Sequence, residues 1–114
     1  MKRWMPVVVV PALTSFLAVT ASAQVDEGKA VYEGAMPKCK ICHSIGGVGN
    51  AQGSLDGVGS KLKADEIKAW LRTPHDMADK AKATRKPAMP AFGPDKLSDA
   101  DLEALTAYLL SLTK

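Results

Sequence analysis

Cys39-Lys40-Ile41-Cys42-His43 places two thiols three positions apart and an imidazole directly after the second thiol. This spacing is typical of covalent haem attachment, in which both thiols add to the vinyl groups of the porphyrin and the histidine lies next to the iron. A zinc site would need a second pair of ligands, and the chain has only one other histidine, His75. A redox-active dithiol is the alternative. It would need a strand before the motif and a helix directly after it, whereas glycines follow the motif here.

The first 23 of the 114 residues have the layout of a secretory signal peptide. A basic start precedes an apolar run over residues 5–19, and small residues at 21–23 precede Gln24. The run is short for a membrane span, which needs about 20 apolar residues, and two prolines interrupt it. We predict cleavage after residue 23 and export to the periplasm without stable membrane insertion. An uncleaved N-terminal anchor is the alternative.

Residues 24–114 are expected to form one domain. A domain this small usually needs a disulfide, a metal or a cofactor, and a large apolar cofactor would add the core that the chain lacks. Without residues 1–23 the chain has 13 basic and 12 acidic side chains, a net charge of +1. The two propionates of a haem would make that charge slightly negative. This balance gives no indication of a nucleic-acid partner, and we expect a monomer.

Apolar residues recur at helical spacing in three segments, and no segment alternates as a strand would. The spacing predicts helices over residues 25–35 and 63–72 and a last helix with Ser98 as its N-cap. A polar loop is predicted over residues 75–88, and the glycine-rich segment 46–59 cannot be a regular helix. The fold class is therefore all-α. The last helix should bury a stripe formed by Leu102, Leu105, Tyr108, Leu109 and Leu112.

Met89 is the candidate for the second ligand of a haem iron that His43 holds from one side. Pro87 and Pro90 flank Met89 and bar helix formation, so the thioether is presented by a loop. A thioether is soft and neutral, so it favours ferrous iron and raises the reduction potential relative to a second imidazole.

Other residues compete with Met89 for this role. His75 would give a bis-histidine site of lower potential, and Met77 is a further candidate. Met36 lies too close to Cys39 along the chain to cross readily to the opposite face of a haem. An empty sixth position would indicate a gas sensor or a peroxidase.

With these features the chain resembles the class I cytochromes c, which are small monohaem proteins with His/Met ligation. The resemblance covers residues 24–114 and rests on the Cys-x-x-Cys-His motif, on Met89-Pro90 46 residues after His43, and on the amphipathic last helix. It implies a cytochrome c fold of three to four helices and long loops around one covalently attached haem c. It also implies thioether bonds from Cys39 and Cys42, with His43 proximal and Met89 distal to the iron.

The resemblance extends to residues around the haem. Residues 53–59 resemble the family loop Pro-x-Leu-x-Gly, in which the carbonyl of the proline accepts a hydrogen bond from the proximal histidine. Gly53 stands in the place of that proline, so the carbonyl is retained and the stiffness is not. Leu55 and Phe92 are further predicted haem contacts. Gly28 and Tyr32, one turn apart, match the glycine and aromatic residue that pack the first helix on the last.

The function implied is an extracytoplasmic one-electron carrier, cycling between Fe(III) and Fe(II) and serving redox partner proteins through an exposed haem edge. No catalytic dyad appears in the sequence, and we do not predict an enzyme. The alternatives are a haem c subunit held in a larger oxidoreductase complex and an open-site sensor or peroxidase. The predicted partner surface, which could also be an ordinary solvated charge run, comprises Lys38, Lys40, Lys82, Arg85 and Lys86.

Overall fold

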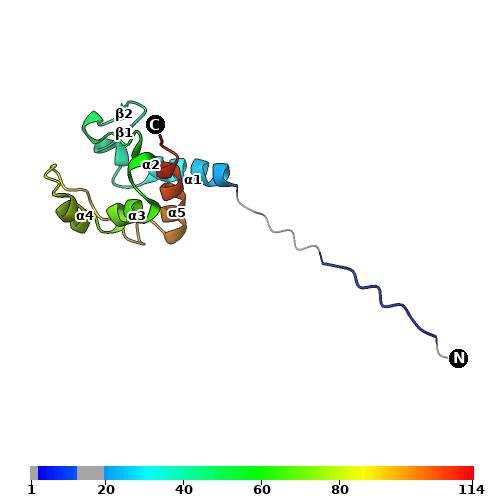
Figure 1. The fold of residues 1–114 in the computed structure, drawn as a ribbon. Coiled ribbons are helices and arrows are strands. Elements are labelled where there is room, and N and C mark those ends of the chain that lie inside the picture. Colours follow the sequence, from blue (N-terminus) through cyan, green and yellow to red (C-terminus); the bar gives the residue numbers. More distant parts are fainter. Residues whose placement is uncertain (1–2, 13–19) are drawn as a thin grey trace.

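The computed structural model describes residues 3–12 and 20–114 of the chain. Helices dominate these residues, with little sheet, which confirms the all-α class and is consistent with a cytochrome c fold (Figure 1). The elements in chain order are α1 (Ala21–Gly34), the 3-10 helix η1 (Cys39–Ile41), strands β1 (Ser44–Ile45) and β2 (Val48–Gly49), the 3-10 helix η2 (Ala51–Gly53), α2 (Val58–Lys61), α3 (Ala64–Arg72), α4 (Pro74–Ala81) and α5 (Asp99–Leu110).

The predicted signal peptide, residues 1–23, falls partly outside the described residues, at 1–2 and 13–19. Residues 3–12 contain neither helix nor strand, and their side chains are exposed. Helix α1 begins at Ala21, so the predicted cleavage position lies within its first turn. Within residues 3–12 and 20–114, no helix has the length and apolar character that a membrane crossing requires.

Helices α1 and α5 cross in close contact, as Gly28 and Tyr32 predicted. A Cβ atom at Gly28 would overlap the carbonyl oxygen of Ala104 and would lie 2.7 Å from Cβ of Tyr108. One turn further on, the rings of Tyr32 and Tyr108 meet with centroids 6.0 Å apart and planes tilted by 60°. The absence of a side chain at Gly28 therefore sets how closely the first and last helices approach.

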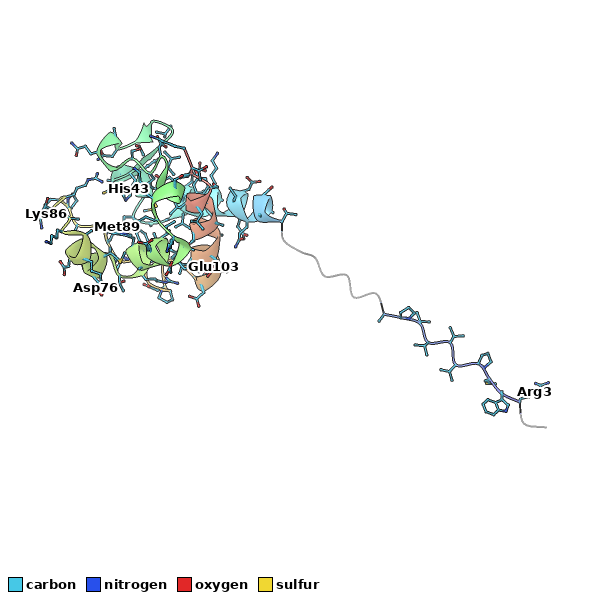
Figure 2. All side chains as sticks on the ribbon, viewed as in Figure 1. Arg3, His43, Asp76, Lys86, Met89 and Glu103 are labelled. Carbon is cyan, nitrogen blue, oxygen red and sulfur yellow. The ribbon has the colours of Figure 1, made fainter. Side chains whose placement is uncertain are left out.

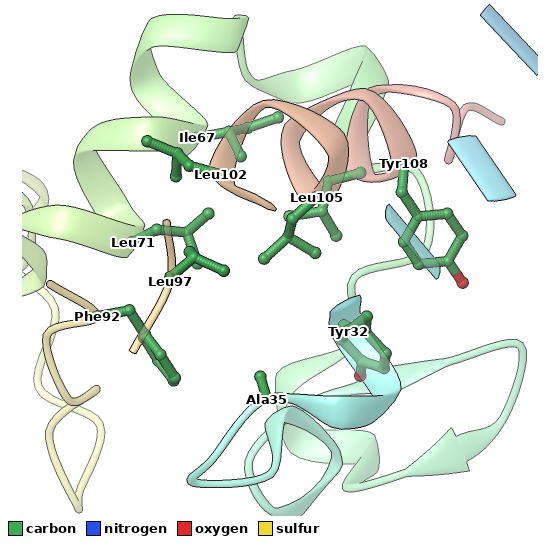
Figure 3. Packing of buried hydrophobic residues seen from close by; sticks show 10 residues of the cluster. Tyr32, Ala35, Ile67, Leu71, Phe92, Leu97, Leu102, Leu105 and Tyr108 are labelled. Atoms are coloured by element: carbon green, nitrogen blue, oxygen red, sulfur yellow. The ribbon is translucent and has the colours of Figure 1, made fainter. Parts of the chain in front are cut away.

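The hydrophobic core forms where α1, α3 and α5 meet (Figure 3). Ser98 caps α5 by accepting a hydrogen bond from the amide of Asp101 at 3.1 Å, as the sequence predicted. The predicted stripe of α5 is buried except for Leu112, which is half-buried. The buried cluster consists of Tyr32, Ala35, Ile67, Leu71, Phe92, Leu97, Leu102, Leu105, Tyr108 and Leu109.

A short antiparallel hairpin, β1–β2, follows the Cys-x-x-Cys-His motif, so the expectation of no strand is wrong here. Ile45 pairs with Val48 across a two-residue turn of Gly46 and Gly47, whose φ angles are 59° and 83°. Positive φ at both central residues is the geometry of a tight hairpin turn that glycine adopts without strain. The Gly-Gly pair was the available signal, but strands of two residues are too short to show alternation.

Helix α4 occupies much of the segment that was predicted to be a polar loop, residues 75–88. Pro74 ends α3 and is also the first residue of α4, where its fixed φ suits a helix and its missing N–H costs nothing. Asp76 in the first turn favours the helix dipole as well. The loop prediction holds only from Lys82 onward, where φ of 53° ends the helix.

Substitution of Gly28 by alanine should destabilise the domain, because the new methyl group would push α5 away from α1. We expect a loss of roughly 1–3 kcal/mol, the usual cost of overpacking a core, measured by urea unfolding. Gly34→Ala is the matched control, since nothing lies within 4 Å of a Cβ at that position of the same helix. Equal effects of the two substitutions would contradict a steric role for Gly28.

Candidate cofactor site

A cavity of about 780 Å³ lies between the Cys-x-x-Cys-His motif and the segment that contains α4 and Met89. Its size falls within the range of roughly 300–1,000 Å³ that is usual for ligand and cofactor pockets. Most side chains around it are apolar, including Leu62, Trp70 and Leu109. The sequence-predicted site residues that line it are Cys39, Cys42, His43, Leu55, Met89 and Phe92.

The motif itself is wound into a tight turn. The amides of Cys42 and His43 both donate to the carbonyl oxygen of Cys39, at 3.1 and 2.9 Å. Both cysteines are free and half-buried. The turn thus brings two thiols and the imidazole to one wall of the cavity.

The surroundings of the motif do not suit a redox-active dithiol. Helix α1 precedes it and the β1–β2 hairpin follows it, so Cys39 has no strand before it and no α-helix directly after it. Burial raises the pKa of the Cys39 thiol, whereas catalytic dithiols lower the pKa of the attacking thiol. These two observations disfavour the oxidoreductase alternative.

The imidazole of His43 is oriented by the loop that follows the hairpin. Its Nδ1 lies 2.9 Å from the carbonyl oxygen of Gly53, the contact that the resemblance implied for this position. A carbonyl oxygen can only accept, so Nδ1 carries the proton and the lone pair on Nε2 is free for a metal. Burial is the main cause that lowers the pKa of His43. The hydrogen bond to Gly53 opposes this effect and raises the pKa, and the positive charge of Arg85 lowers the pKa further.

Backbone hydrogen bonds hold Gly53 in this place. The amide of Leu55 donates to the carbonyl of Ser44 at 2.8 Å, and the amide of Gly53 donates to the carbonyl of Asn50 at 3.1 Å. The amide of Asn50 in turn donates to the carbonyl of His43 at 3.0 Å. Residues 50–55 are therefore fastened to the same segment whose histidine they orient.

Met89 reaches the cavity from the opposite segment of the chain (Figure 2). Its side chain is half-buried and packs against the hydrophobic core. His75 also lines the cavity, but it is exposed near the start of α4. Neither Met77 nor Met36 is among the lining residues, and Met36 is 64% exposed. Of the four competitors, Met89 and His75 alone border the cavity.

Arg72, which the sequence reading missed, anchors the chain just beyond Met89. One guanidinium nitrogen, Nη1, donates to the carbonyls of Phe92 and Leu97, at 2.9 and 2.6 Å. The amide of Phe92 donates to the carbonyl of Leu71 at 2.9 Å, so the same strip of chain is bonded twice to the end of α3. A lone arginine at the end of an amphipathic helix gave no signal of these contacts 20 and 25 residues away.

The residues present fit a haem. Tyr32 lines the cavity, and within residues 3–12 and 20–114 its hydroxyl is the buried side-chain oxygen without a hydrogen-bond partner. Burial raises the pKa of Tyr32 to about 12, so the hydroxyl stays protonated. It can therefore donate a hydrogen bond to a polar group of a cofactor. Two thiols could attach the porphyrin covalently, and an imidazole and a thioether could serve as the two ligands of its iron. No cluster of three His, Cys, Asp or Glu side chains suitable for a bare metal ion occurs in the described parts of the chain.

An all-α domain with a Cys-x-x-Cys-His motif in the wall of a largely apolar cavity has the features of a c-type cytochrome domain. Residues 23–109 match the family described as cytochrome C oxidase, cbb3-type, subunit III, and the chain belongs to this family. Membership of this cytochrome family implies haem c and haem-based electron transfer.

A curated relative is cytochrome c oxidase subunit 2 of Alkalihalophilus pseudofirmus (strain ATCC BAA-2126 / JCM 17055 / OF4), which is 32% identical over 96 residues. The match covers 76% of this chain and 25% of the relative, so the chain is similar to about a quarter of that subunit. No solved structure matches the chain significantly.

Arg72→Ala should destabilise the domain by about 2–3 kcal/mol, because the carbonyls of Phe92 and Leu97 would lose the hydrogen bonds that they accept from a charged donor. Asp99→Asn is the control: Arg72 Nη2 and Asp99 Oδ1 lie 3.0 Å apart, but the Asp99 side chain is 96% exposed, and exposed ion pairs contribute little. Denaturant unfolding of both variants checks this. A larger loss for Asp99→Asn than for Arg72→Ala would contradict the anchoring role of the two carbonyl contacts.

Proposed function

We propose that the chain is an extracytoplasmic one-electron carrier domain with one haem c. Cys39 and Cys42 would hold the haem through thioether bonds, and His43 and Met89 would be the axial ligands of its iron. The observation that carries this proposal is the single cavity bordered by all four side chains, with Nδ1 of His43 engaged by Gly53. Met89 is preferred to His75 because its side chain is half-buried against the core, whereas His75 is exposed.

A haem bound in this cavity supplies a one-electron couple between Fe(III) and Fe(II). The protein's part is to keep both axial side chains in place while the charge changes. The hydrogen bond to Gly53 fixes the ring of His43, and the Arg72 and Leu71 contacts fix the backbone three residues after Met89. Leu55 and Phe92 add apolar walls that exclude water. A site that does not rearrange loses little energy to reorganisation when an electron arrives or leaves.

The predicted partner surface is only partly a set of free cations. Lys40, Lys82 and Lys86 are exposed, and Lys86 borders the cavity. Lys38 donates to the carbonyl of Glu33 at 2.9 Å, and Arg85 donates to the carbonyl of Cys42 at 2.6 Å. We assign the encounter with an acidic redox partner to the exposed cations Lys40, Lys82, Arg85 and Lys86, since a hydrogen bond to a neutral carbonyl leaves the charge of Arg85 in place. Weak, charge-steered binding suits rapid exchange of partners.

The second candidate is a haem c domain held in a larger oxidoreductase complex, and the comparisons favour it specifically. The matching family and the curated relative are both described as oxidase subunits. In that case electrons would pass to a fixed neighbour rather than to diffusing partners. Co-purification with other subunits at high salt would support this candidate, whereas recovery of a haem-loaded monomer would support the free carrier.

Removal of the proposed distal ligand tests the site. Met89→Ala should create rapid CO binding to the reduced protein and abolish the iron–sulfur charge-transfer band of the oxidised protein, because the sixth coordination position loses its thioether. Its reduction potential should change as well. These are read from visible spectra and redox titration.

The controls for this test are His75→Ala and Met77→Ala, both of which should retain the charge-transfer band and remain indifferent to CO. Retention of the band in Met89→Ala, together with its loss in Met77→Ala, would reassign the ligand to Met77. A parent protein without the band, in which only His75→Ala creates CO binding, would reassign it to His75. A parent protein that already binds CO would indicate an open site and would favour the sensor or peroxidase alternative.

Charge reversal tests the partner surface. The double substitution Lys40→Glu and Lys86→Glu should slow electron transfer to an acidic partner about tenfold at low salt, because it converts attraction into repulsion. The difference should shrink as ionic strength rises. Lys96→Glu, which lies beside a separate, smaller cavity between α1 and α5, is the control. Equal rates for both variants would show that these lysines are ordinary solvated charges.

A further inference from the structure

We propose that Arg85 is a positioning residue that ties the loop carrying Met89 to the haem-attachment motif, and that Gly53 provides the space for this tie. The inference rests on the proposed function, because it assigns Met89 to the iron. It goes beyond that function by giving Arg85 a role that neither the motif nor charge steering requires.

The contact joins two segments that are distant in sequence. Nη2 of Arg85 donates to the carbonyl oxygen of Cys42 at 2.6 Å, across a separation of 43 residues. Cys42 is the second cysteine of the motif and immediately precedes His43. A charged donor on a backbone carbonyl makes one of the stronger hydrogen bonds in proteins. The arginine therefore links the Met89 side of the cavity to the His43 side.

The loop around Met89 has few other attachments. Ala83 is still bonded to the end of α4 through its amide, and the next backbone bond to another element is from Phe92 to Leu71. Between these points, the described residues make one hydrogen bond to another segment of the chain, and that bond is the Arg85 contact. Met89 thus lies between two hydrogen-bonded positions, Arg85 four residues before it and Phe92 three residues after it.

Gly53 is needed at this place because of space and not because of its backbone angles. Its φ is not in the left-handed region, unlike that of Gly57. A Cβ atom at Gly53 would overlap both the carbonyl oxygen of Cys42 and Nη1 of Arg85. Any side chain there, including the proline ring of the resembled family loop, would compete with the guanidinium. Gly53 and Arg85 are therefore two parts of one arrangement.

This arrangement also bears on the orientation of His43. The Arg85 guanidinium bonds the carbonyl of Cys42 and lies against Gly53, whose own carbonyl accepts from the His43 ring. The same guanidinium thus touches the residue before His43 and the residue that orients it. A displacement of Arg85 should loosen the Met89 loop first and the His43 ring second.

The first test measures the rate of CO binding to the reduced, haem-loaded protein, which requires Met89 to leave the iron. Arg85→Ala should raise this rate about tenfold, the factor expected for loss of a charged hydrogen bond worth roughly 1.5 kcal/mol. Arg85→Lys should recover only part of the parent's behaviour, since lysine keeps the charge but not the planar fork. Lys80→Ala is the control, because Lys80 is an exposed cation of α4 that does not border the cavity. Equal rates for Arg85→Ala and Lys80→Ala would overturn the proposal.

The second test does not depend on iron ligation, so it separates failure of this inference from failure of the proposed function. Hydrogen exchange should speed up in Arg85→Ala at the bonded amides on both sides of the tie, those of His43, Gly53 and Phe92, and stay as in the parent in Lys80→Ala. Gly53→Ala should speed up exchange at the same amides, and it should add to Arg85→Ala in the double variant, because its Cβ would also overlap the backbone carbonyl oxygen of Cys42. Unchanged exchange in Arg85→Ala would refute the tie even if Met89 proves to be the ligand. If Gly53→Ala does not fold, the Arg85 variants decide.

Discussion

The hydrogen bond between Nδ1 of His43 and the carbonyl of Gly53, at 2.9 Å, is the interaction on which the site depends. It selects one tautomer, fixes the ring plane and leaves Nε2 for a metal. The hairpin and the loop over residues 50–55 make this bond possible, because their backbone hydrogen bonds bring Gly53 close to His43. Helices α1, α3 and α5 then supply the apolar frame in which that segment is seated.

The opposite wall of the cavity is organised by two arginines. Arg72 holds the chain after Met89 through the carbonyls of Phe92 and Leu97, and Arg85 holds the chain before it through the carbonyl of Cys42. Both use a side chain to satisfy backbone acceptors in a region without regular secondary structure. A loop bordered by prolines cannot form helical hydrogen bonds, so it takes its order from these side chains.

Features defined by a few adjacent residues could be predicted from the sequence. The Cys-x-x-Cys-His motif is displayed directly by the sequence. The contact of Gly28 and Tyr32 with the last helix and the role of the Gly53 carbonyl were implied by the resemblance to the class I cytochromes c, which matches short local patterns. Helix α4 was missed because Pro74 ends one helix and starts the next, and its polar residues resemble a loop. The arginine contacts were missed because their acceptors are backbone carbonyls 20 to 43 residues away, and a charge in a polar run gives no sign of such a partner.

The visible spectrum of the purified protein, oxidised and reduced, with and without CO, tests the central claim that His43 and Met89 share one haem iron. We expect a six-coordinate low-spin haem that is indifferent to CO and shows the weak iron–sulfur charge-transfer band when oxidised. A low-spin spectrum without that band would point to His75 in place of Met89. A ready CO adduct, or a protein without haem, would contradict the carrier assignment itself.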